Sequence, residues 1–324
     1  MNGGFFMLLK FRIELSMTLD TKDFEKVFNK KFYLQELEND EYLDTTYSED
    51  GLLVKYRRSQ YKKKIKLLID PQIILKGNES NADKLIRKLK KLTSSYFDSE
   101  YQLSDFLVSG LYLNSDLNVG KSYIDDYIKV LKRIGKTKGF SAFEDKILDE
   151  NYGFYLRSNN KSVFFYIYDL ESSVREQCSA IEKKDMLSYS KGKLRVEIRL
   201  AKLKAIQLYT QSADSSEQIK ELISKLEYIF MEIYSKVIPY GDFYKKSKAV
   251  DLIFQAIKDA KLRRKMLQLI TLIPDKKSLH LAQKEMNCRN TDEIMIAFAK
   301  INLSPITISK RHDAKHLKNI YEYL

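Results

Sequence analysis

Two stretches of sequence, KSVFFYIYDLE at residues 161–171 and LRVEIRL at residues 194–200, indicate the fold class of this chain. Successive side chains of a β-strand point to opposite faces of a sheet. The second stretch therefore has an apolar face of Leu194, Val196, Ile198 and Leu200 and a charged face of Arg195, Glu197 and Arg199. In the first stretch, Tyr166 and Tyr168 share one face. If both strands lie in one sheet, tyrosine hydroxyls, a carboxylate and two guanidinium groups share a surface, which suits the handling of a phosphodiester.

The same alternation gives other predicted strands a polar, mostly cationic face. These faces hold Lys10, Arg12 and Glu14, then Lys55 and Arg57, then Lys62, Lys64 and Lys66. Helices cover only the apolar side of such a sheet. We therefore expect the other side to be free to contact a phosphate backbone, with tyrosines between the cations for base stacking.

The first 200 residues repeat one pattern of elements. The first copy has strands predicted at residues 5–17, 52–58 and 61–69 and helices at residues 21–30 and 81–97. The second copy has strands predicted at residues 106–119, 152–157, 161–169 and 193–200 and helices at residues 121–135 and 171–187. This order predicts an α+β fold of two pseudo-repeated β-α-β-β-α units with helices on one sheet face.

The remainder of the chain is predicted to be helical, so we expect domains at residues 1–100, 101–210 and 211–324. Helices are expected at residues 215–236, 245–271, 276–287, 290–301 and 304–322, with breaks at Pro274 and Pro305. Ser304 would be the N-cap of the last helix. That helix carries Lys310, Arg311 and Lys315 and could enter a DNA groove as part of a helix-turn-helix, or the region could be a purely structural helical cap.

Charge is the strongest compositional signal. The 324 residues have a formal net charge of +13, and residues 51–91 hold thirteen Lys/Arg against three Asp/Glu. This suggests a polyanionic partner, with nucleic acid ahead of a membrane surface, although a charge run alone is equally consistent with a solvated face. No apolar run is long enough to span a membrane. The two cysteines, Cys178 and Cys288, are far apart, which fits a reducing compartment, and we expect a cytoplasmic protein.

Two kinds of chemistry fit the polar face. The hydroxyl of Tyr168 could attack a phosphodiester, although in a chain with 22 tyrosines any one of them is more often simply part of a sheet. Glu197 and Asp116 could hold Mg²⁺ or Mn²⁺ through carboxylate oxygens, with Asn118 and Glu14 as further candidates. The simpler role for Glu197 is an ion pair with Arg195 or Arg199.

Other motifs are weak or missing. HDAKH, residues 312–316, would place two histidines at i and i+4 on a helix, as in a zinc pair, but no third ligand is evident. The chain has no GxxxxGK loop, no GxSxG and no CxxC pair. A nucleotide-binding loop and a zinc cluster are therefore not expected.

Four segments resemble the replication initiation factor family, a group of rolling-circle replication initiators of phages, plasmids and integrative elements of low-GC Gram-positive bacteria. They are VSGLYLNSDLNVG (108–120), SYIDDYIKVLKRIGKTKGF (122–140), FFYIYDLE (164–171) and LRVEIRL (194–200). The resemblance covers residues 100–210 well and the N-terminal unit loosely. Its motifs are moderately specific: their order and spacing agree with the family, but no triplet of residues looks invariant.

The resemblance implies a protein that nicks one DNA strand at an origin through a tyrosine, with a divalent metal held by acidic residues of the sheet. Tyr168 would be that tyrosine, with Tyr166 beside it, and Glu197 would be a metal ligand. Family members often carry an acidic residue where this chain has Tyr112, which leaves Asp116 or Asn118 to compensate. Expected partners are origin DNA, single-stranded or in a hairpin, a host helicase and a second copy of the chain, and no membrane.

Two other functions remain open from the residues alone. A non-catalytic DNA-binding regulator or accessory factor, derived from such an initiator, would use the sheet only for binding. An RNA-binding module would also fit a sheet that carries tyrosines.

Overall fold

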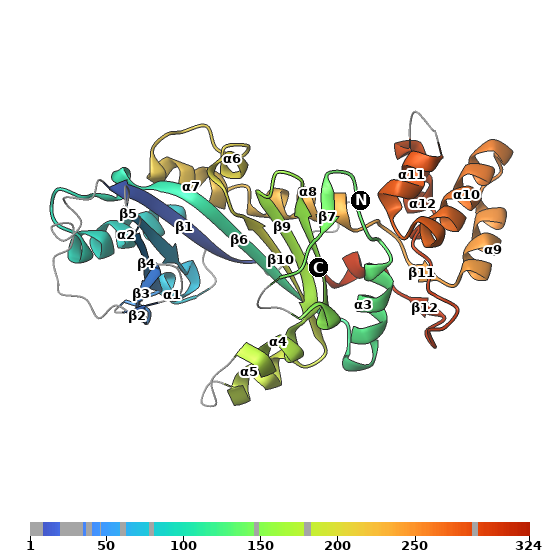
Figure 1. Cartoon of the computed structure of the whole chain (residues 1–324), viewed down its shortest axis with the longest axis horizontal. Helices are drawn as coiled ribbons and strands as arrows, with labels where there is room; N and C mark the ends of the chain where they lie inside the picture. The colour runs from blue at the N-terminus through green and yellow to red at the C-terminus, as the bar shows by residue number, and fades with distance from the viewer. Residues whose placement is uncertain are drawn as a thin grey trace. The chain divides into compact units, whose positions relative to one another are not determined.

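The computed structural model describes residues 9–19, 35–36, 41–45, 47–58, 63–77, 81–145, 149–177, 183–286 and 291–324. Ten strands form one sheet in the order β2-β3-β4-β5-β1-β6-β10-β9-β8-β7, and β11 pairs with β12 in a separate ribbon (Figure 1). With helices throughout and concentrated towards the C-terminus, the predicted α+β class is confirmed.

The elements have the following bounds. The strands are β1 (Lys10–Leu19), β2 (Gln35–Glu36), β3 (Glu41–Asp44), β4 (Leu52–Arg58), β5 (Lys63–Ile69), β6 (Leu107–Asn118), β7 (Phe140–Ala142), β8 (Gly153–Ser158), β9 (Val163–Asp169), β10 (Lys193–Leu200), β11 (Phe243–Tyr244) and β12 (His316–Leu317). The helices are α1 (Pro71–Leu75), α2 (Ala82–Tyr96), α3 (Ile124–Lys132), α4 (Leu170–Gln177), α5 (Lys183–Ser190), α6 (Leu203–Ile206), α7 (Ser215–Ile223), α8 (Leu226–Val237), α9 (Lys246–Ala256), α10 (Ala260–Lys276), α11 (Leu279–Glu285) and α12 (Asp292–Lys300). Short 3₁₀ turns lie at Leu103–Asp105, Lys121–Tyr123, Glu150–Tyr152 and Ile320–Tyr323.

The chain folds into two compact units that are interleaved in sequence. Unit 2 contains Leu9–Asn114 and Arg199–Ile229, and the described part of unit 1 contains Ser115–Ile198 and Phe230–Leu324. The domain boundaries expected near residues 100 and 210 stay predictions. No helix in the described ranges is both long and apolar enough to cross a membrane.

Unit 2 is built on strands with one buried face. Ile13 and Leu15 of β1 and Ile65 and Leu67 of β5 are fully buried, and their neighbours in sequence are partly or fully exposed. The amphipathic helix α2 packs on the apolar side through Leu85, Ile86, Leu89 and Tyr96. The expected alternation is therefore confirmed, and it leaves the polar side chains of β1, β4 and β5 on the other face.

Unit 1 carries helices on both faces of its strands. On β9, Phe165 is fully buried, and its ring lies 6.1 Å from that of Tyr234 on α8. On the opposite face, Tyr166 and Tyr168 are only 2% and 6% exposed. They pack in a cluster with Tyr155, Leu170 and Val174, against which Phe143, Phe164 and Leu187 also lie. The expectation of an exposed tyrosine face is wrong here, because α4 and α5, which follow β9, supply apolar side chains to that face.

Most predicted elements lie within a few residues of the observed ones, but several helices are divided. The helix predicted at residues 171–187 is α4 and α5, the helix at residues 215–236 is α7 and α8, and the helix at residues 245–271 is α9 and α10. Pro274 does not break a helix, since it lies inside the last turn of α10. The helix predicted at residues 21–30 lies outside the described residues.

The helix predicted at residues 304–322 is wrong, and with it the groove-entering helix and the paired histidines on one helix face. Residues 303–308 are all buried in a non-helical segment that runs beside β11. The Ser304 amide donates to the Asp242 carbonyl at 2.8 Å, and the Ile308 amide donates to the Tyr244 carbonyl at 2.9 Å. The Ser304 hydroxyl accepts from the Ile306 amide as an N-cap would, but no helix follows, because the backbone beyond it bonds to Tyr244 instead. The β-branched run Ile306-Thr307-Ile308 favours this extended form.

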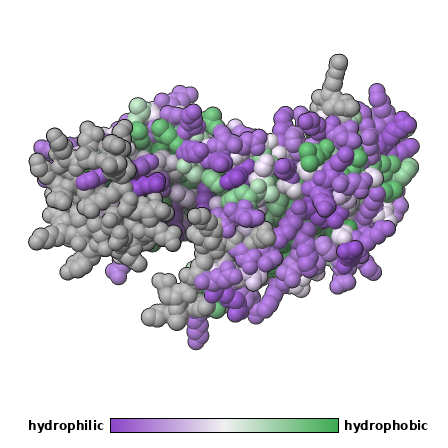
Figure 2. Space-filling model, in the orientation of Figure 1, coloured by the Kyte–Doolittle hydropathy of each residue, from purple (hydrophilic) through white to green (hydrophobic). Residues whose placement is uncertain are grey.

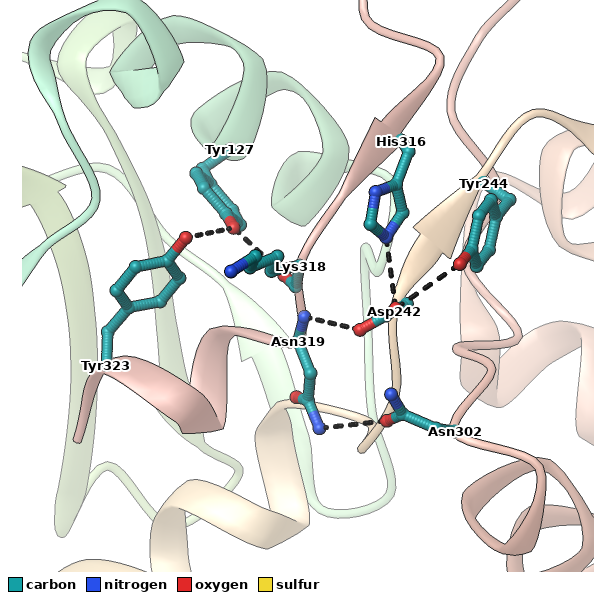
Figure 3. A network of polar contacts seen from close by, with 8 residues as sticks. All are labelled: Tyr127, Asp242, Tyr244, Asn302, His316, Lys318, Asn319 and Tyr323. Atoms are coloured by element: carbon teal, nitrogen blue, oxygen red, sulfur yellow. Dashed lines mark hydrogen bonds and ion pairs between the residues drawn. The ribbon is translucent and has the colours of Figure 1, made fainter.

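Asp242 holds the C-terminal segment in place. Its carboxylate accepts from the backbone amide of Asn319 at 2.8 Å and from the Tyr244 hydroxyl at 3.3 Å, and it lies 3.0 Å from Nε2 of His316 (Figure 3). The His316 ring stacks on that of Tyr244 with centroids 4.5 Å apart. A further contact joins the same segment to α3, where the Tyr127 hydroxyl donates to the Lys318 carbonyl. The position of residues 316–319 is thus set by hydrogen bonds with the side chains of Asp242 and Tyr127 rather than by a helix.

Candidate nucleic-acid interface

Unit 2 presents a sheet face on which cations lie opposite cations. We call Arg12, Lys55, Arg57, Lys64 and Lys66 the unit 2 cationic face. In the β4–β5 pairing, Lys55 is directly opposite Lys66, and Arg57 is directly opposite Lys64. Like charges in this position destabilise a sheet. Burial lowers the pKa of Lys64, and the positive charge of Lys66 lowers it further, against the opposing effect of Glu14. Lys55 and Arg57 thus each face a cation on β5, and on its other side Arg57 is opposite Glu41 of β3.

Two carboxylates compensate part of this charge. Glu14 lies 3.0 Å from Nζ of Lys66, and Asp70 lies 2.9 Å from Nε of Arg12. Asp70 is also the N-cap of α1, where it accepts from the Gln72 amide at 3.1 Å. In the described part of the chain no ion pair engages Lys55, Arg57 or Lys64. Those three cations remain available to an external anion.

A β-bulge in β6 brings hydroxyl groups to Glu14. Glu14 is opposite Gly110 and Leu15 is opposite Val108, so Ser109 is the extra residue. The hydroxyl of Ser109 donates to Glu14 Oε1 at 2.8 Å, and that of Tyr112 donates to Oε2 at 3.3 Å. At Gly110 a Cβ would lie 3.1 Å from the Glu14 Cβ, so the glycine permits this close pairing. Tyr112 therefore orients Glu14.

In unit 1, a second polar cluster forms around Asp116. Arg195 donates to both carboxylate oxygens, from Nε at 2.6 Å and from Nη2 at 2.8 Å. The Tyr189 hydroxyl donates to Oδ2 at 2.9 Å. Burial and this hydrogen bond raise the pKa of Tyr189 to about 12. Burial alone would lower the pKa of Arg195, but the hydrogen bonds and charge of Asp116 raise it above its ordinary value.

Tyr189, on α5, was not singled out from the sequence. Its side chain is exposed, and Nζ of Lys193 lies 3.3 Å from its ring centroid. The direction of its side chain could not be predicted from the sequence, because α5 has no clear apolar stripe that would show which side of the helix is buried. Ser109 was missed for a similar reason, since a bulge reverses the alternation on which the face assignments depend.

The predicted nucleophile Tyr168 lies beside Glu197 but away from solvent. Its hydroxyl donates to Glu197 Oε2 at 3.4 Å, a long contact. Tyr166 donates to Asp145 at 3.1 Å, so its hydroxyl faces a different carboxylate. The sequence thus predicted the pairing of a tyrosine with Glu197, and the structure adds that α4 and α5 cover it.

The predicted metal ligands do not form a metal site in this arrangement. Both oxygens of Asp116 already accept hydrogen bonds, and the Arg195 guanidinium occupies the position next to them. In the described ranges, no group of three or more His, Cys, Asp or Glu side chains could hold a metal ion. We therefore derive no chemical step through Mg²⁺ or Mn²⁺.

The remaining residues that were predicted to bind nucleic acid do not lie together. Arg199 lies on the half-buried face of β10 in unit 2, and Lys62 lies outside the described residues. Lys310, Arg311 and Lys315 are exposed on the non-helical C-terminal segment. Each of these predicted roles stays a prediction.

Comparisons with known proteins assign no family. No protein-family model and no curated protein matches the chain. Among solved structures, the chain is similar to the rolling circle replication initiator protein from Geobacillus stearothermophilus, with 14% identity and a TM-score of 0.36 over 71% of this chain and 85% of that chain. A likeness of this size does not establish a shared activity.

Proposed function

We propose that this chain binds DNA through the unit 2 cationic face. The observation that carries the proposal is the pairing of Lys55 with Lys66 and of Arg57 with Lys64 across β4 and β5. This arrangement lowers the stability of the sheet and is relieved when phosphates lie between the cations. Phosphate contacts of this kind position a strand without reading its sequence.

Within that function, we propose the role of a replication initiator that nicks one strand of a mobile element's origin. The Tyr168 oxygen would attack the phosphorus of a phosphodiester and pass its proton to Glu197. The bond from phosphorus to the 3′ oxygen would break, and that oxygen would take up a proton from solvent and leave as a 3′-hydroxyl. The product on the protein would be a 5′-phosphotyrosine. This role requires α4 and α5 to move off Tyr168, which is 6% exposed.

A second candidate is a DNA-binding protein without nicking activity, a regulator or accessory factor derived from an initiator. Two observations favour it. Tyr168 is buried in an apolar cluster, and Asp116 is neutralised by Arg195. In this case binding depends on salt but produces no covalent adduct.

Nicking is tested by incubating the protein with supercoiled DNA that carries the origin of its own element, with and without Mg²⁺ or Mn²⁺. The initiator role predicts relaxed circles and a protein–DNA adduct on Tyr168 by mass spectrometry, both lost in Tyr168→Phe. Tyr189→Phe is the matched variant, since it removes an exposed hydroxyl instead. Activity that is lost in Tyr189→Phe and kept in Tyr168→Phe would move the nucleophile to α5. Absence of nicked product with intact DNA binding would support the non-catalytic candidate.

The binding surface is tested by lysine acetylation. Bound single-stranded DNA is expected to protect Lys55, Lys64 and Lys66 from acetylation, whereas Lys91, exposed on α2, is expected to react at the same rate with and without DNA. Equal protection by RNA of the same length would favour the RNA-binding alternative. Unchanged reactivity of all three lysines would place the DNA elsewhere.

A further inference from the structure

A second group of cations lies in unit 1, where α9 ends and α10 begins; Figure 1 shows the two helices. The sequence KDAKLRRK, residues 258–265, carries five of them: Lys258, Lys261, Arg263, Arg264 and Lys265. We call these five residues, together with Phe254, the α10 corner. The only acid in the run, Asp259, is the N-cap of α10 and accepts from the Lys261 and Leu262 amides at 2.8 and 3.3 Å.

The fold does not account for this concentration of charge. No ion pair in the described part of the chain engages Lys258, Lys261, Arg264 or Lys265. Lys261 is three and four residues from Arg264 and Lys265, a spacing at which like charges on a helix repel. Cations in the first turns of a helix also oppose its dipole. The charge therefore lowers the stability of α10, and a polyanion is the partner that complements it.

An aromatic ring completes the surface. Phe254, near the end of α9, is 53% exposed. The Arg263 guanidinium lies 5.0 Å from its ring centroid and donates from Nη1 to the Ile257 carbonyl at 3.3 Å. These contacts hold the ring while much of it faces solvent, and Figure 2 shows hydrophobic surface among hydrophilic surface over α9 and α10. An exposed ring among cations can stack with a nucleobase while the cations hold the flanking phosphates.

We propose that the α10 corner is a second DNA-binding site, which takes single-stranded DNA. Lys258, Lys261 and Arg264 contact phosphates, and a base stacks on Phe254. This site does not rest on the unit 2 cationic face, because its residues belong to unit 1. It also differs from the expected groove-entering helix at residues 304–322, whose cations lie on a non-helical segment. One chain can then bind two strands or two segments of one strand.

The test counts short oligonucleotides bound to the full chain. Titration with a labelled oligomer of about eight thymidines, followed by fluorescence anisotropy and calorimetry, is expected to give about two oligomers per wild-type chain. The double variant Lys261→Glu/Arg264→Glu is expected to bind about one oligomer per chain, because the phosphate contacts of the α10 corner are lost. Phe254→Ala is expected to weaken that site about 5-fold or more at an unchanged salt slope. The charge-matched control is Lys136→Glu/Lys138→Glu, on an exposed turn elsewhere in unit 1.

Loss of binding cannot be attributed to unfolding in this design, because acids in the first turns of α10 improve its dipole and are expected to keep or raise the melting temperature. A full two-oligomer stoichiometry in the α10 double variant, or an equal loss in the control, would overturn the proposal. A variant of the unit 2 cationic face that still binds two oligomers would count against the proposed function alone. Vesicles of anionic lipid provide the last arm: if the α10 double variant and Phe254→Ala lose vesicle binding and keep both oligomers, the corner is a lipid surface and the proposal is wrong.

Discussion

At the residue scale, tyrosine hydroxyls in this chain fall into buried structural groups and exposed ones. Tyr96 shows the structural kind: its hydroxyl lies 3.0 Å from that of Tyr56 and donates to Asp44, which is 2% exposed. Tyr96→Phe is expected to lower the free energy of unfolding by about 1–3 kcal/mol, because Asp44 loses a donor to its buried carboxylate. Chemical denaturation measures this. Tyr228→Phe, at a 62% exposed position, should change little, and equal losses in the two variants would contradict this role.

Tyr127 gives a pH dependence at the same scale. Burial raises its pKa well above the ordinary value of about 10. The folded state therefore keeps a proton that the unfolded state releases, so this contribution is complete below pH ~10 and decreases as the pH rises further. Tyr127→Phe is expected to lower stability at neutral pH and to flatten its decline between about pH 10 and 11, by about 0.7 kcal/mol per pH unit at pH ~10 and approaching about 1.4 near pH ~11. Denaturation curves across that range that keep the wild-type slope would contradict the assignment.

Gly135 shows how one position joins α3 to the α10–α11 turn. Its φ is +60°, and a Cβ there would lie 2.2 Å from the Lys277 carbonyl oxygen. The Leu279 amide donates to the Ile134 carbonyl beside it at 2.9 Å. Gly135→Ala is expected to lower the melting temperature clearly more than Gly139→Ala, whose φ is +85° with nothing within 4 Å of the added Cβ. Thermal unfolding that gives the same shift for both would exclude the close contact as the cause.

At the element scale, alternation and turn residues predicted the strands well. The bounds of β4 and β10 agree with the predictions because buried and polar side chains alternate there without interruption. The tertiary cover could not be predicted, since nothing in the FFYIYDLE stretch indicates that Leu170, Val174 and Leu187 return over Tyr168. Likewise, the segment from Leu303 to Ile308 is not helical because it makes backbone hydrogen bonds to Asp242 and Tyr244, which are distant in sequence.

The contacts of Asp242 predict the rate of hydrogen exchange in residues 316–321 of the C-terminal segment. Asp242→Asn keeps the size of the side chain but removes its negative charge. That charge strengthens the hydrogen bond from the Asn319 amide and the contact with His316. Hydrogen exchange at residues 316–321 is expected to become faster by an order of magnitude or more, while exchange in β1 and β5 of unit 2 stays unchanged. Uniform acceleration across both units would indicate global destabilisation instead.

At the scale of the whole molecule, the charge of +13 is distributed over separate surfaces. The unit 2 cationic face and the α10 corner each gather cations that no ion pair within the described residues neutralises, apart from Arg12 and Lys66. The sequence predicted the first because it lies on regular strands. It did not indicate the second, because the importance of residues 258–265 depends on the exposure of Phe254 and on where α9 ends. The position of Asp116 on the polar face of its strand could be predicted, but not its hydrogen bonds with Arg195 and Tyr189.

On the scale of the whole chain, we expect the unit 2 cationic face to bind DNA with charges that lower the stability of its own sheet. The most direct measurement compares stability and DNA affinity in Lys55→Glu/Lys64→Glu, which places carboxylates opposite Lys66 and Arg57. We expect stability to rise by about 0.4–2 kcal/mol, from two opposite-charge pairs. Affinity for a single-stranded oligonucleotide, measured in the Lys261→Glu/Arg264→Glu background so that the α10 corner does not contribute, should fall, with a salt slope smaller by about 1.4. Lys91→Glu/Lys204→Glu, exposed in the same unit, should retain most of the affinity. Unchanged affinity and salt slope in the first variant would contradict the claim.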